Sequence, residues 1–271
     1  MNEPISIAVL CAMETEAVHL RNRLTGARDE PLARWRRTRG MIGDVPVDVI
    51  VCGIGLINAA AATSALCALE RPRAIFNYGC SGAHRDDIDP GDVVIASDVV
   101  HFSSLIVLPD GVRRYEGFRY FVDHEQVLAE RLAPDPTLLL TATTAAESVI
   151  LPAWAGVGHP PRVLAGTIGS ADIWTQHGES IRDLHTIHGS LCEEMEAAAI
   201  AQVTATWGVP FLAIKDISNN ELREFTDMTI AGSSVLAHVA SEVGRRAALV
   251  VEATVRAMGA FPRSDQFPLS S

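Results

Sequence analysis

Short apolar runs recur along the chain and alternate with longer stretches in which apolar residues have helical spacing. Continuous apolar runs rich in β-branched residues are typical of strands that are buried on both faces of a sheet. Strands are therefore predicted at residues 5–10, 47–51, 74–77, 92–96, 162–168 and 211–217. Helices are predicted at residues 14–24, 56–69, 194–206 and 231–258. This alternation predicts an α/β fold in which helices flank a central sheet.

Glycine and proline mark the ends of these elements. Gly53 and Gly55 follow one predicted strand and precede a helix, and Gly79 and Gly82 have the same place after another strand. Residues 103–123 are expected to be irregular and aromatic, and residues 150–161 to form a proline-containing loop. No repeat or low-complexity linker divides the sequence. We therefore expect a single domain over residues 1–260 and a loose C-terminal tail over residues 261–271.

The composition narrows the class of protein. With 271 residues, of which 48% are apolar, the chain can bury a large core, and this excludes intrinsic disorder. Its 33 acidic and 22 basic side chains give a formal charge of −11, which repels a nucleic-acid backbone. No apolar stretch reaches the ~18 residues of a membrane span, and the N-terminus lacks the basic start of a signal peptide. We expect a cytoplasmic protein without a nucleic-acid or membrane partner.

The cysteines are scattered and contain no C-x-x-C pair. They are Cys11, Cys52, Cys67, Cys80 and Cys192. Their odd number and apolar surroundings predict free thiols in a reducing compartment. A catalytic role for Cys80 is disfavoured, because the sequence identifies no histidine partner for it.

Two short motifs resemble ligand sites but lack a required part. Gly53-Ile-Gly55 would need a third glycine at position 58 to match a dinucleotide-binding turn, and that residue is Asn58. His185 and His188 have a spacing that can place two imidazoles on one helix face, but no third ligand follows at a suitable interval. A tight turn and surface histidines are the favoured interpretations. No metal or organic cofactor is implied.

Three acidic clusters stand at predicted strand ends or helix starts. They contain Glu14 and Glu16, then Glu193, Glu194 and Glu196, and finally Asp216 and Glu221. Each cluster alone is explained by helix N-terminal charges or polar caps. Together they place carboxylates where ligand sites form in open α/β sheets.

The segments around these clusters resemble the nucleoside phosphorylase and nucleosidase superfamily, and most closely its methylthioadenosine/S-adenosylhomocysteine nucleosidase branch. The matching segments read IAVLCAMETEA, CGIGLINAA, NYGCSGA, PGDVVIASD, GTIGSADIW, EEMEAAAIA and GVPFLAIKDIS, in this order along the chain. The resemblance implies one domain with a mixed central β-sheet flanked by helices. It also implies a purine nucleoside and water as substrates, and a homodimer in which the neighbouring subunit covers part of the site.

The resemblance assigns roles to individual residues. Glu16 matches the glutamate that activates the attacking water, and Met195 and Glu196 match the pair that binds the ribose. Glutamate suits this place, since a carboxylate accepts hydrogen bonds from two vicinal hydroxyls. Trp174 matches an aromatic residue that stacks on the base, and Ile173 beside it encloses the base.

Further positions support this site. Ser218 matches a serine that orients the next residue, Asn219, which occupies a catalytic position. Lys215 stands where the family tends to carry arginine, and it supplies positive charge beside Glu194, although without a bidentate fork.

Asn219 is the main departure from the nucleosidase pattern, which has a general-acid aspartate there. Asparagine donates a hydrogen bond but cannot transfer a proton, and the loss of a general acid typically costs about 10²–10⁴-fold in rate. A 6-oxopurine leaves as an anion more readily than adenine, so that a hydrogen bond to N7 suffices. Asn219 resembles the asparagine of hypoxanthine- and guanine-selective phosphorylases and of futalosine hydrolases, and it predicts such a preference. Asp216 or Glu221 as a substitute acid is the alternative.

The nucleophile distinguishes a hydrolase from a phosphorylase. Phosphorylases of the superfamily hold phosphate with arginines and a Ser or Thr in the glycine-rich turn, whereas this chain has Asn77, Cys80 and Ser81 in that region. Glu16 would also oppose a phosphate. The candidate phosphate ligands Arg36, Arg37, Arg39 and Arg85 are interpreted as surface charge. The predicted function is therefore a nucleosidase; a phosphate-dependent phosphorylase and a non-catalytic nucleoside-binding or storage protein are the alternatives.

Overall fold

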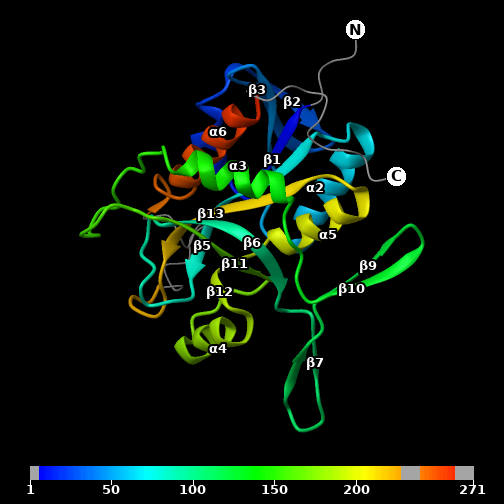
Figure 1. Cartoon of the computed structure of the whole chain (residues 1–271), viewed down its shortest axis with the longest axis vertical. Coiled ribbons are helices and arrows are strands. Elements are labelled where there is room, and N and C mark those ends of the chain that lie inside the picture. Colours follow the sequence, from blue (N-terminus) through cyan, green and yellow to red (C-terminus); the bar gives the residue numbers. More distant parts are fainter. Residues whose placement is uncertain (1–5, 227–238, 260–271) are drawn as a thin grey trace.

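In the part of the chain that the structure describes, nine strands form a mixed β-sheet at the centre (Figure 1). The computed structural model describes residues 6–226 and 239–259. The strands of this sheet are β1 (Ile7–Cys11), β2 (Thr25–Leu32), β3 (Trp35–Ile42), β4 (Val45–Val51), β5 (Ala74–Ala83), β6 (Val93–His101), β11 (Val163–Ser170), β12 (Ser190–Glu194) and β13 (Phe211–Asn219). Their order is β12-β11-β6-β13-β5-β1-β4-β3-β2. Because β12 also pairs with β5, the five strands from β12 to β5 in this order form a closed ring.

Parallel and antiparallel pairs share this sheet. β1 pairs in parallel with β4 and β5, whereas β13 pairs in parallel with β5 and antiparallel with β6. Along β1, Ile7 and Val9 join one buried cluster, and Ala8 and Leu10 join another on the opposite face. Burial on both faces explains why these strands are continuous apolar runs in the sequence.

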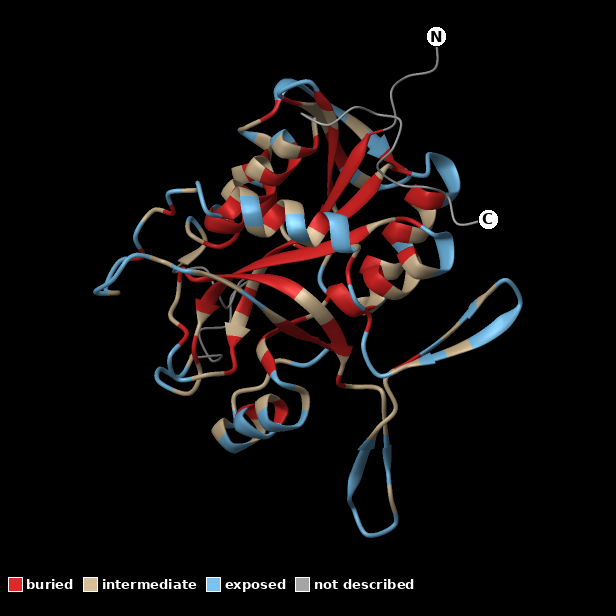
Figure 2. Cartoon of the chain, in the orientation of Figure 1, coloured by how far each residue is buried: buried red, intermediate tan, exposed pale blue. Residues whose placement is uncertain are grey.

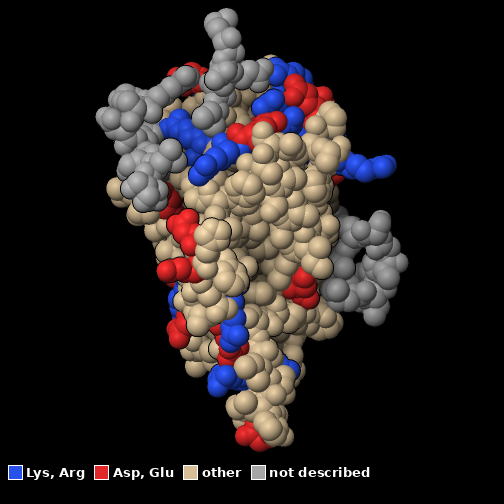
Figure 3. Space-filling view, turned by 90° about the vertical axis from the view of Figure 1, so that its right-hand side faces the viewer, with Lys and Arg blue, Asp and Glu red and all other residues tan. Residues whose placement is uncertain are grey.

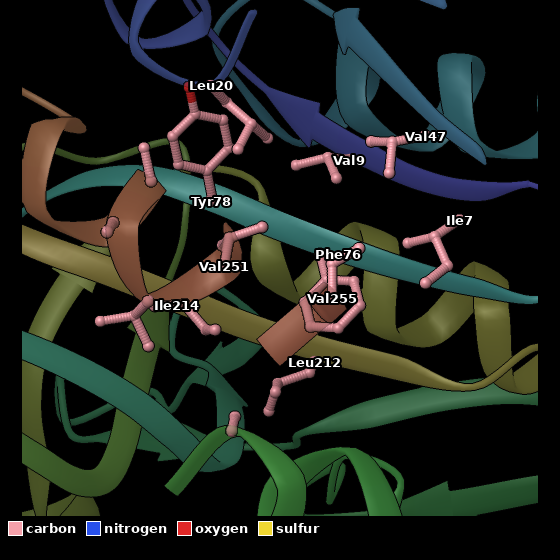
Figure 4. Close-up of a cluster of buried hydrophobic side chains, with 14 of the residues drawn as sticks. Ile7, Val9, Leu20, Val47, Phe76, Tyr78, Leu212, Ile214, Val251 and Val255 are labelled. Atoms are coloured by element: carbon pink, nitrogen blue, oxygen red, sulfur yellow. The ribbon is translucent and has the colours of Figure 1, made fainter. Parts of the chain in front are cut away.

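Helices cover both faces of the sheet. They are α1 (Glu14–Arg21), α2 (Leu56–Leu69), α3 (Pro136–Ala146), α4 (Gly178–His188), α5 (Ala197–Trp207) and α6 (Arg245–Gly259). α1, α3 and α6 pack on one face, while α2 and α5 pack on the other. Figure 4 shows the first of these layers, in which Val251 and Val255 of α6 face Phe76 of β5 and Leu212 of β13. The predicted fold class, an α/β domain with a mixed sheet between helices, is confirmed.

The segment 103–123 is not irregular, and this prediction was wrong. It contains β7 (Leu105–Val107), β8 (Arg113–Tyr115) and β9 (Phe118–Val122), and β10 (Glu125–Ala129) follows directly. β7 pairs with β8 and β9 with β10, and the two hairpins project from the body of the molecule as largely exposed ribbons (Figures 1 and 2). Because strands this short bury little of either face, their sequences have no clear hydrophobic pattern.

The predicted helix at residues 231–258 is shorter than expected. Residues 227–238 lie outside the described part of the chain, residues 239–244 form turns, and α6 begins only at Arg245. Gly244 has a φ of +76°, and this conformation interrupts the helical pattern. The predicted helix at 194–206 likewise begins late, at Ala197, because Glu194 ends β12. The predicted tail at 261–271 lies outside the described residues.

Within residues 6–226 and 239–259, none of the helices has both the length and the apolar character that a membrane crossing requires. The cysteines Cys11, Cys52, Cys67, Cys80 and Cys192 are all free, as predicted.

Candidate active site

A cavity of about 440 Å³ opens at the carboxyl ends of the central strands. Its walls come from segments that follow β1, β4 and β11 and from the last residues of β5, β12 and β13. The predicted site residues that line it are Glu16, Cys80, Ser81, Ile173, Trp174, Glu194, Met195, Glu196, Ser218 and Asn219. The fold thus brings the three acidic clusters of the sequence to one place, as expected for an open α/β sheet.

Glu16 is buried in the first turn of α1, and backbone amides hold its carboxylate. Oε2 accepts from the N–H groups of Ala12 and Met13, each at 3.0 Å, and Oε1 accepts from the N–H of Cys80 at 2.9 Å. Three N–H donors from two different strand ends fix the orientation of the side chain. One acceptor direction of the carboxylate remains, and because Glu16 lines the cavity it can take a proton there from a small donor.

Lys215 lies beneath the cavity and joins two of its carboxylates. Its Nζ is 2.8 Å from Glu194 Oε2 and 3.4 Å from Glu196 Oε2, and all three side chains are buried. Burial disfavours the charge on Lys215, but Glu194 and Glu196 outweigh this effect and raise the pKa of its ammonium group. Burial also raises the pKa of Glu196 to about 8, although Lys215 acts in the opposite direction.

Glu194 and Glu196 have different tasks in this network. Glu194 accepts from the N–H groups of Glu196 and Ala197, so that it caps the start of α5. Glu196 accepts from the N–H of Gly55 at 3.0 Å and lines the cavity beside Met195. Glu196 therefore presents free acceptor capacity to a ligand, whereas Glu194 positions the backbone.

Asn219 has a fixed orientation at another wall of the cavity. Its Nδ2 donates to Glu221 Oε1 at 2.8 Å, and its Oδ1 accepts from Ser218 Oγ at 2.7 Å. Because a carboxylate only accepts, the amide nitrogen of Asn219 must face Glu221. The second N–H of Nδ2 is therefore a donor, while Oδ1 accepts from Ser218 Oγ and keeps one further lone pair.

Trp174 and Ile173 follow β11 and form part of the cavity wall. Trp174 Nε1 donates to Glu221 Oε1 at 3.3 Å, which ties the indole to the same carboxylate as Asn219. Ile173 is exposed at the opening. An indole ring held by its N–H offers a flat apolar face for a planar ligand.

Cys80 and Ser81 contribute mainly through their backbone. Ser81 Oγ donates to the carbonyl of Asp216. The Ser81 carbonyl lies 3.2 Å from Ser218 Oγ, whose single hydrogen has the closer acceptor in Asn219 Oδ1. Burial and the neighbouring charge of Glu16 raise the pKa of the Cys80 thiol well above its usual value. A neutral thiol is a poor nucleophile, which agrees with the interpretation of Cys80 as non-catalytic.

Asp216, one of the two substitute acids, does not line the cavity. Its Oδ1 accepts from the N–H of Gly244, and its Oδ2 accepts from the N–H of Arg246 at the start of α6. Asp216 therefore faces the helix on the other side of β13. Glu221, the second candidate, lines the cavity and stays available.

Three polar residues of the cavity were not assigned a role from the sequence: His84, Thr175 and Glu193. Glu193 belongs to the second acidic cluster, and its neighbours Glu194 and Glu196 were assigned instead. His84 and Thr175 each directly follow a segment that matches the family. Nothing in the neighbouring sequence indicates which residues they contact. Only the fold shows that they meet.

The arginines considered as phosphate ligands are engaged elsewhere. Their partners at 2.6–2.9 Å are Asp29 for Arg36, Glu70 for Arg37, Asp48 for Arg39 and Asp87 for Arg85. Arg37 is buried rather than superficial, and it pairs with Glu70 and Glu30, whose side chains stay partly exposed. Basic and acidic groups alternate at the upper end of the molecule, where β2 and β3 lie (Figure 3). No Arg or Lys side chain appears among the described residues that line the cavity.

The histidine pair of α4 is not a surface feature. His185 and His188 are half-buried, and His185 Nδ1 donates to the carbonyl of Ser190 at 2.9 Å. In the part of the chain that the structure describes, no group of three or more His, Cys, Asp or Glu side chains is arranged to hold a metal ion.

A model of the Phosphorylase superfamily matches residues 6–256. The chain belongs to this superfamily. Within it, the 5′-methylthioadenosine/S-adenosylhomocysteine nucleosidase of Chromohalobacter salexigens is 30% identical over 254 residues, which span 93% of this chain and 97% of that relative. The order of the matching segments in the sequence had predicted this membership.

Solved structures of the superfamily share the fold. The corresponding nucleosidase of Streptococcus pneumoniae, solved with a transition-state inhibitor, has a TM-score of 0.72 at 23% identity, over 94% of this chain and all of that one. The futalosine hydrolase of Helicobacter pylori has a TM-score of 0.73 at 18% identity, over 93% of this chain and 97% of that one. Both likenesses establish the architecture of the domain.

Proposed function

We propose that the protein hydrolyses the N-glycosidic bond of a purine nucleoside. The observation that supports this most directly is the meeting of Glu16, Glu196 and Asn219 in one cavity, with Trp174 on its wall. The 30% identity to a methylthioadenosine/S-adenosylhomocysteine nucleosidase over nearly the whole chain agrees with this class of reaction.

In the proposed mechanism, Glu196 accepts hydrogen bonds from the ribose hydroxyls, and Met195 packs against the sugar. Glu16 takes a proton from the water that attacks the anomeric carbon. As the bond to the base breaks, the sugar acquires oxocarbenium character, and the two carboxylates stabilise this positive charge. Their hydrogen bonds to Gly55, Cys80 and the amides before α1 fix them before the reaction, so little reorganisation is required.

Asn219 and Trp174 hold the leaving base. Trp174 and Ile173 enclose the ring, and the free N–H of Asn219 donates to N7. Ser218 and Glu221 keep the amide in the donor orientation. Because a hydrogen bond supports an anionic leaving group without neutralising it, we propose a preference for 6-oxopurine nucleosides or futalosine-type substrates over adenine nucleosides.

Water is the proposed nucleophile, since the cavity holds the carboxylate of Glu16 and its described lining has no arginine or lysine. A panel of purine nucleosides, assayed for free base with and without phosphate, tests the proposal. Base release in phosphate-free buffer is expected. A strict requirement for phosphate would indicate a phosphorylase instead, and binding without base release would indicate a non-catalytic nucleoside-binding protein.

A further inference from the structure

Glu193 is a buried carboxylate that borders the same cavity but takes no part in the mechanism above. Its Oε1 accepts from the backbone N–H of Thr175 at 2.6 Å, and its Oε2 accepts from Thr175 Oγ1 at 2.8 Å. Its Oε2 also lies 3.1 Å from His84 Nε2, which carries a proton because a carboxylate only accepts. Two neighbouring residues thus hold Glu193 in one orientation.

Thr175 directly follows Trp174, which forms the wall proposed to stack on the base. A free backbone N–H at this position would offer the base a donor. Here Glu193 uses that N–H, and it also uses the Thr175 hydroxyl. The polar group that remains is the carboxylate itself, which has four acceptor directions and three donors. This part of the cavity therefore presents an acceptor.

The opposite polarity is found at Asn219, whose free N–H is a donor. A base that fits both groups has an acceptor at one edge and a donor at the other. All purines have the acceptor N7 on the five-membered ring. At position 1 of the six-membered ring, however, adenine has an acceptor nitrogen, whereas a 6-oxopurine has an N–H donor.

We infer that Glu193 determines the specificity for the base by accepting a hydrogen bond from N1–H of a 6-oxopurine. This inference rests on the proposed function, since it assumes that the cavity binds a purine against Trp174. It adds a second origin of selectivity, independent of the leaving-group chemistry at Asn219. With adenine, two acceptors face each other and the buried carboxylate gains no partner, a mismatch that binding sites reject strongly.

Free bases test this inference without reference to the 5′ substituent of the substrate. Calorimetry would compare hypoxanthine, 1-methylhypoxanthine and adenine on the wild-type protein. A hydrogen bond to a charged group corresponds to roughly 10- to 100-fold in affinity. Hypoxanthine should therefore bind at least tenfold more tightly than either of the other bases. The wild-type comparison needs no variant and remains decisive if substitutions disturb folding.

A variant pair locates the effect. Glu193→Gln replaces one acceptor oxygen by a donor and should abolish the preference for hypoxanthine over adenine. Glu179→Gln, at an exposed position on α4, removes the same charge outside the cavity and should leave the preference intact.

Equal affinities for hypoxanthine and 1-methylhypoxanthine, or tighter binding of adenine, would overturn the inference. A Glu193→Gln protein that is folded by circular dichroism and still prefers hypoxanthine would overturn it as well. The predicted preference without base release from any nucleoside would overturn the proposed function and support the inference. Absence of binding for all three bases would overturn both.

Discussion

Gly79 leaves the space that the carboxylate of Glu16 occupies. A Cβ atom on Gly79 would lie 2.8 Å from Glu16 Cδ, closer than such atoms approach in real structures. The next residue, Cys80, donates its backbone N–H to the same carboxylate. The glycine-rich end of β5 therefore accommodates and binds the carboxylate of Glu16. This position requires glycine, because any side chain at residue 79 would overlap Glu16.

Gly79→Ala should lower the turnover number by about 100-fold, because the added methyl group displaces Glu16 and a shift of about 1 Å in a catalytic group has an effect of this size. Steady-state kinetics of base release would measure it. Gly26→Ala is the matched control, since Gly26 also has a positive φ but has open space around its Cα. Equal activity of the two variants would contradict the requirement for glycine at position 79.

Glu16→Gln should reduce base release by at least 100-fold, since the amide cannot take a proton from water. Its NH₂ group would also face the N–H donors of Ala12, Met13 or Cys80. Glu14→Gln, on the same helix turn and half-exposed, is the control and should retain full activity. A Glu16→Gln enzyme with near-normal turnover would show that another group activates the water.

Asn219→Asp should raise kcat/KM for adenine nucleosides by about 10²-fold or more, the usual contribution of a general acid. The new carboxyl group would stand where Asn219 Nδ2 now lies 2.8 Å from Glu221 Oε1, so that the two carboxyls share one proton. A parallel Glu221→Gln variant measures whether Glu221 itself supplies a proton. If Asn219→Asp gains nothing on adenine nucleosides, the explanation of Asn219 is wrong.

The pH profile of kcat/KM should rise from acidic toward alkaline pH. Burial raises the pKa of Glu196 to about 8, so that below this pH the carboxyl is protonated and accepts fewer hydrogen bonds from the ribose. At pH 6, two units below this pKa, the loss should be roughly 100-fold relative to the alkaline plateau above pH 8.

Lys215 lowers the pKa of Glu196, and its removal should move this acidic limb to higher pH. Lys215→Met is the test and Lys215→Arg the control that retains the charge. Because Lys215→Met leaves Glu194 and Glu196 buried without their cation, it should also cost about 3–5 kcal/mol in the free energy of unfolding. A flat profile between pH 6 and 8 in the wild-type enzyme would contradict the requirement for an ionised Glu196.

Six of the buried strands could be predicted from the sequence, because burial on both faces makes each of them a continuous apolar run. β12, also buried, was missed because its sequence, SLCEE, is not apolar. β2 and β3 were missed for the opposite reason. Their cross-strand pairs include Arg36 with Pro31 and Arg37 with Glu30, and arginine ion pairs replace the apolar alternation of a typical edge strand. α3 was missed because its sequence is rich in threonine; its start depends on the cap of Asp135.

For the candidate site, the sequence resemblance named ten residues that line the cavity, together with Lys215 below it. It could not name His84 or Thr175, because their importance comes from contacts to Glu193 across the fold. The sequence also left Asp216 and Glu221 equivalent as substitute acids. Only the direction of β13 side chains, with Asp216 toward α6, separates them.

In the proposed reaction, water activated by Glu16 attacks the sugar of a purine nucleoside. Hydrolysis of inosine and 5′-methylthioadenosine in phosphate-free ¹⁸O-labelled water, followed by mass spectrometry of the released sugar, tests it most directly. We predict one ¹⁸O atom at the anomeric position and free base in equal amount. A sugar released only when phosphate is added, as an unlabelled 1-phosphate, would contradict the claim.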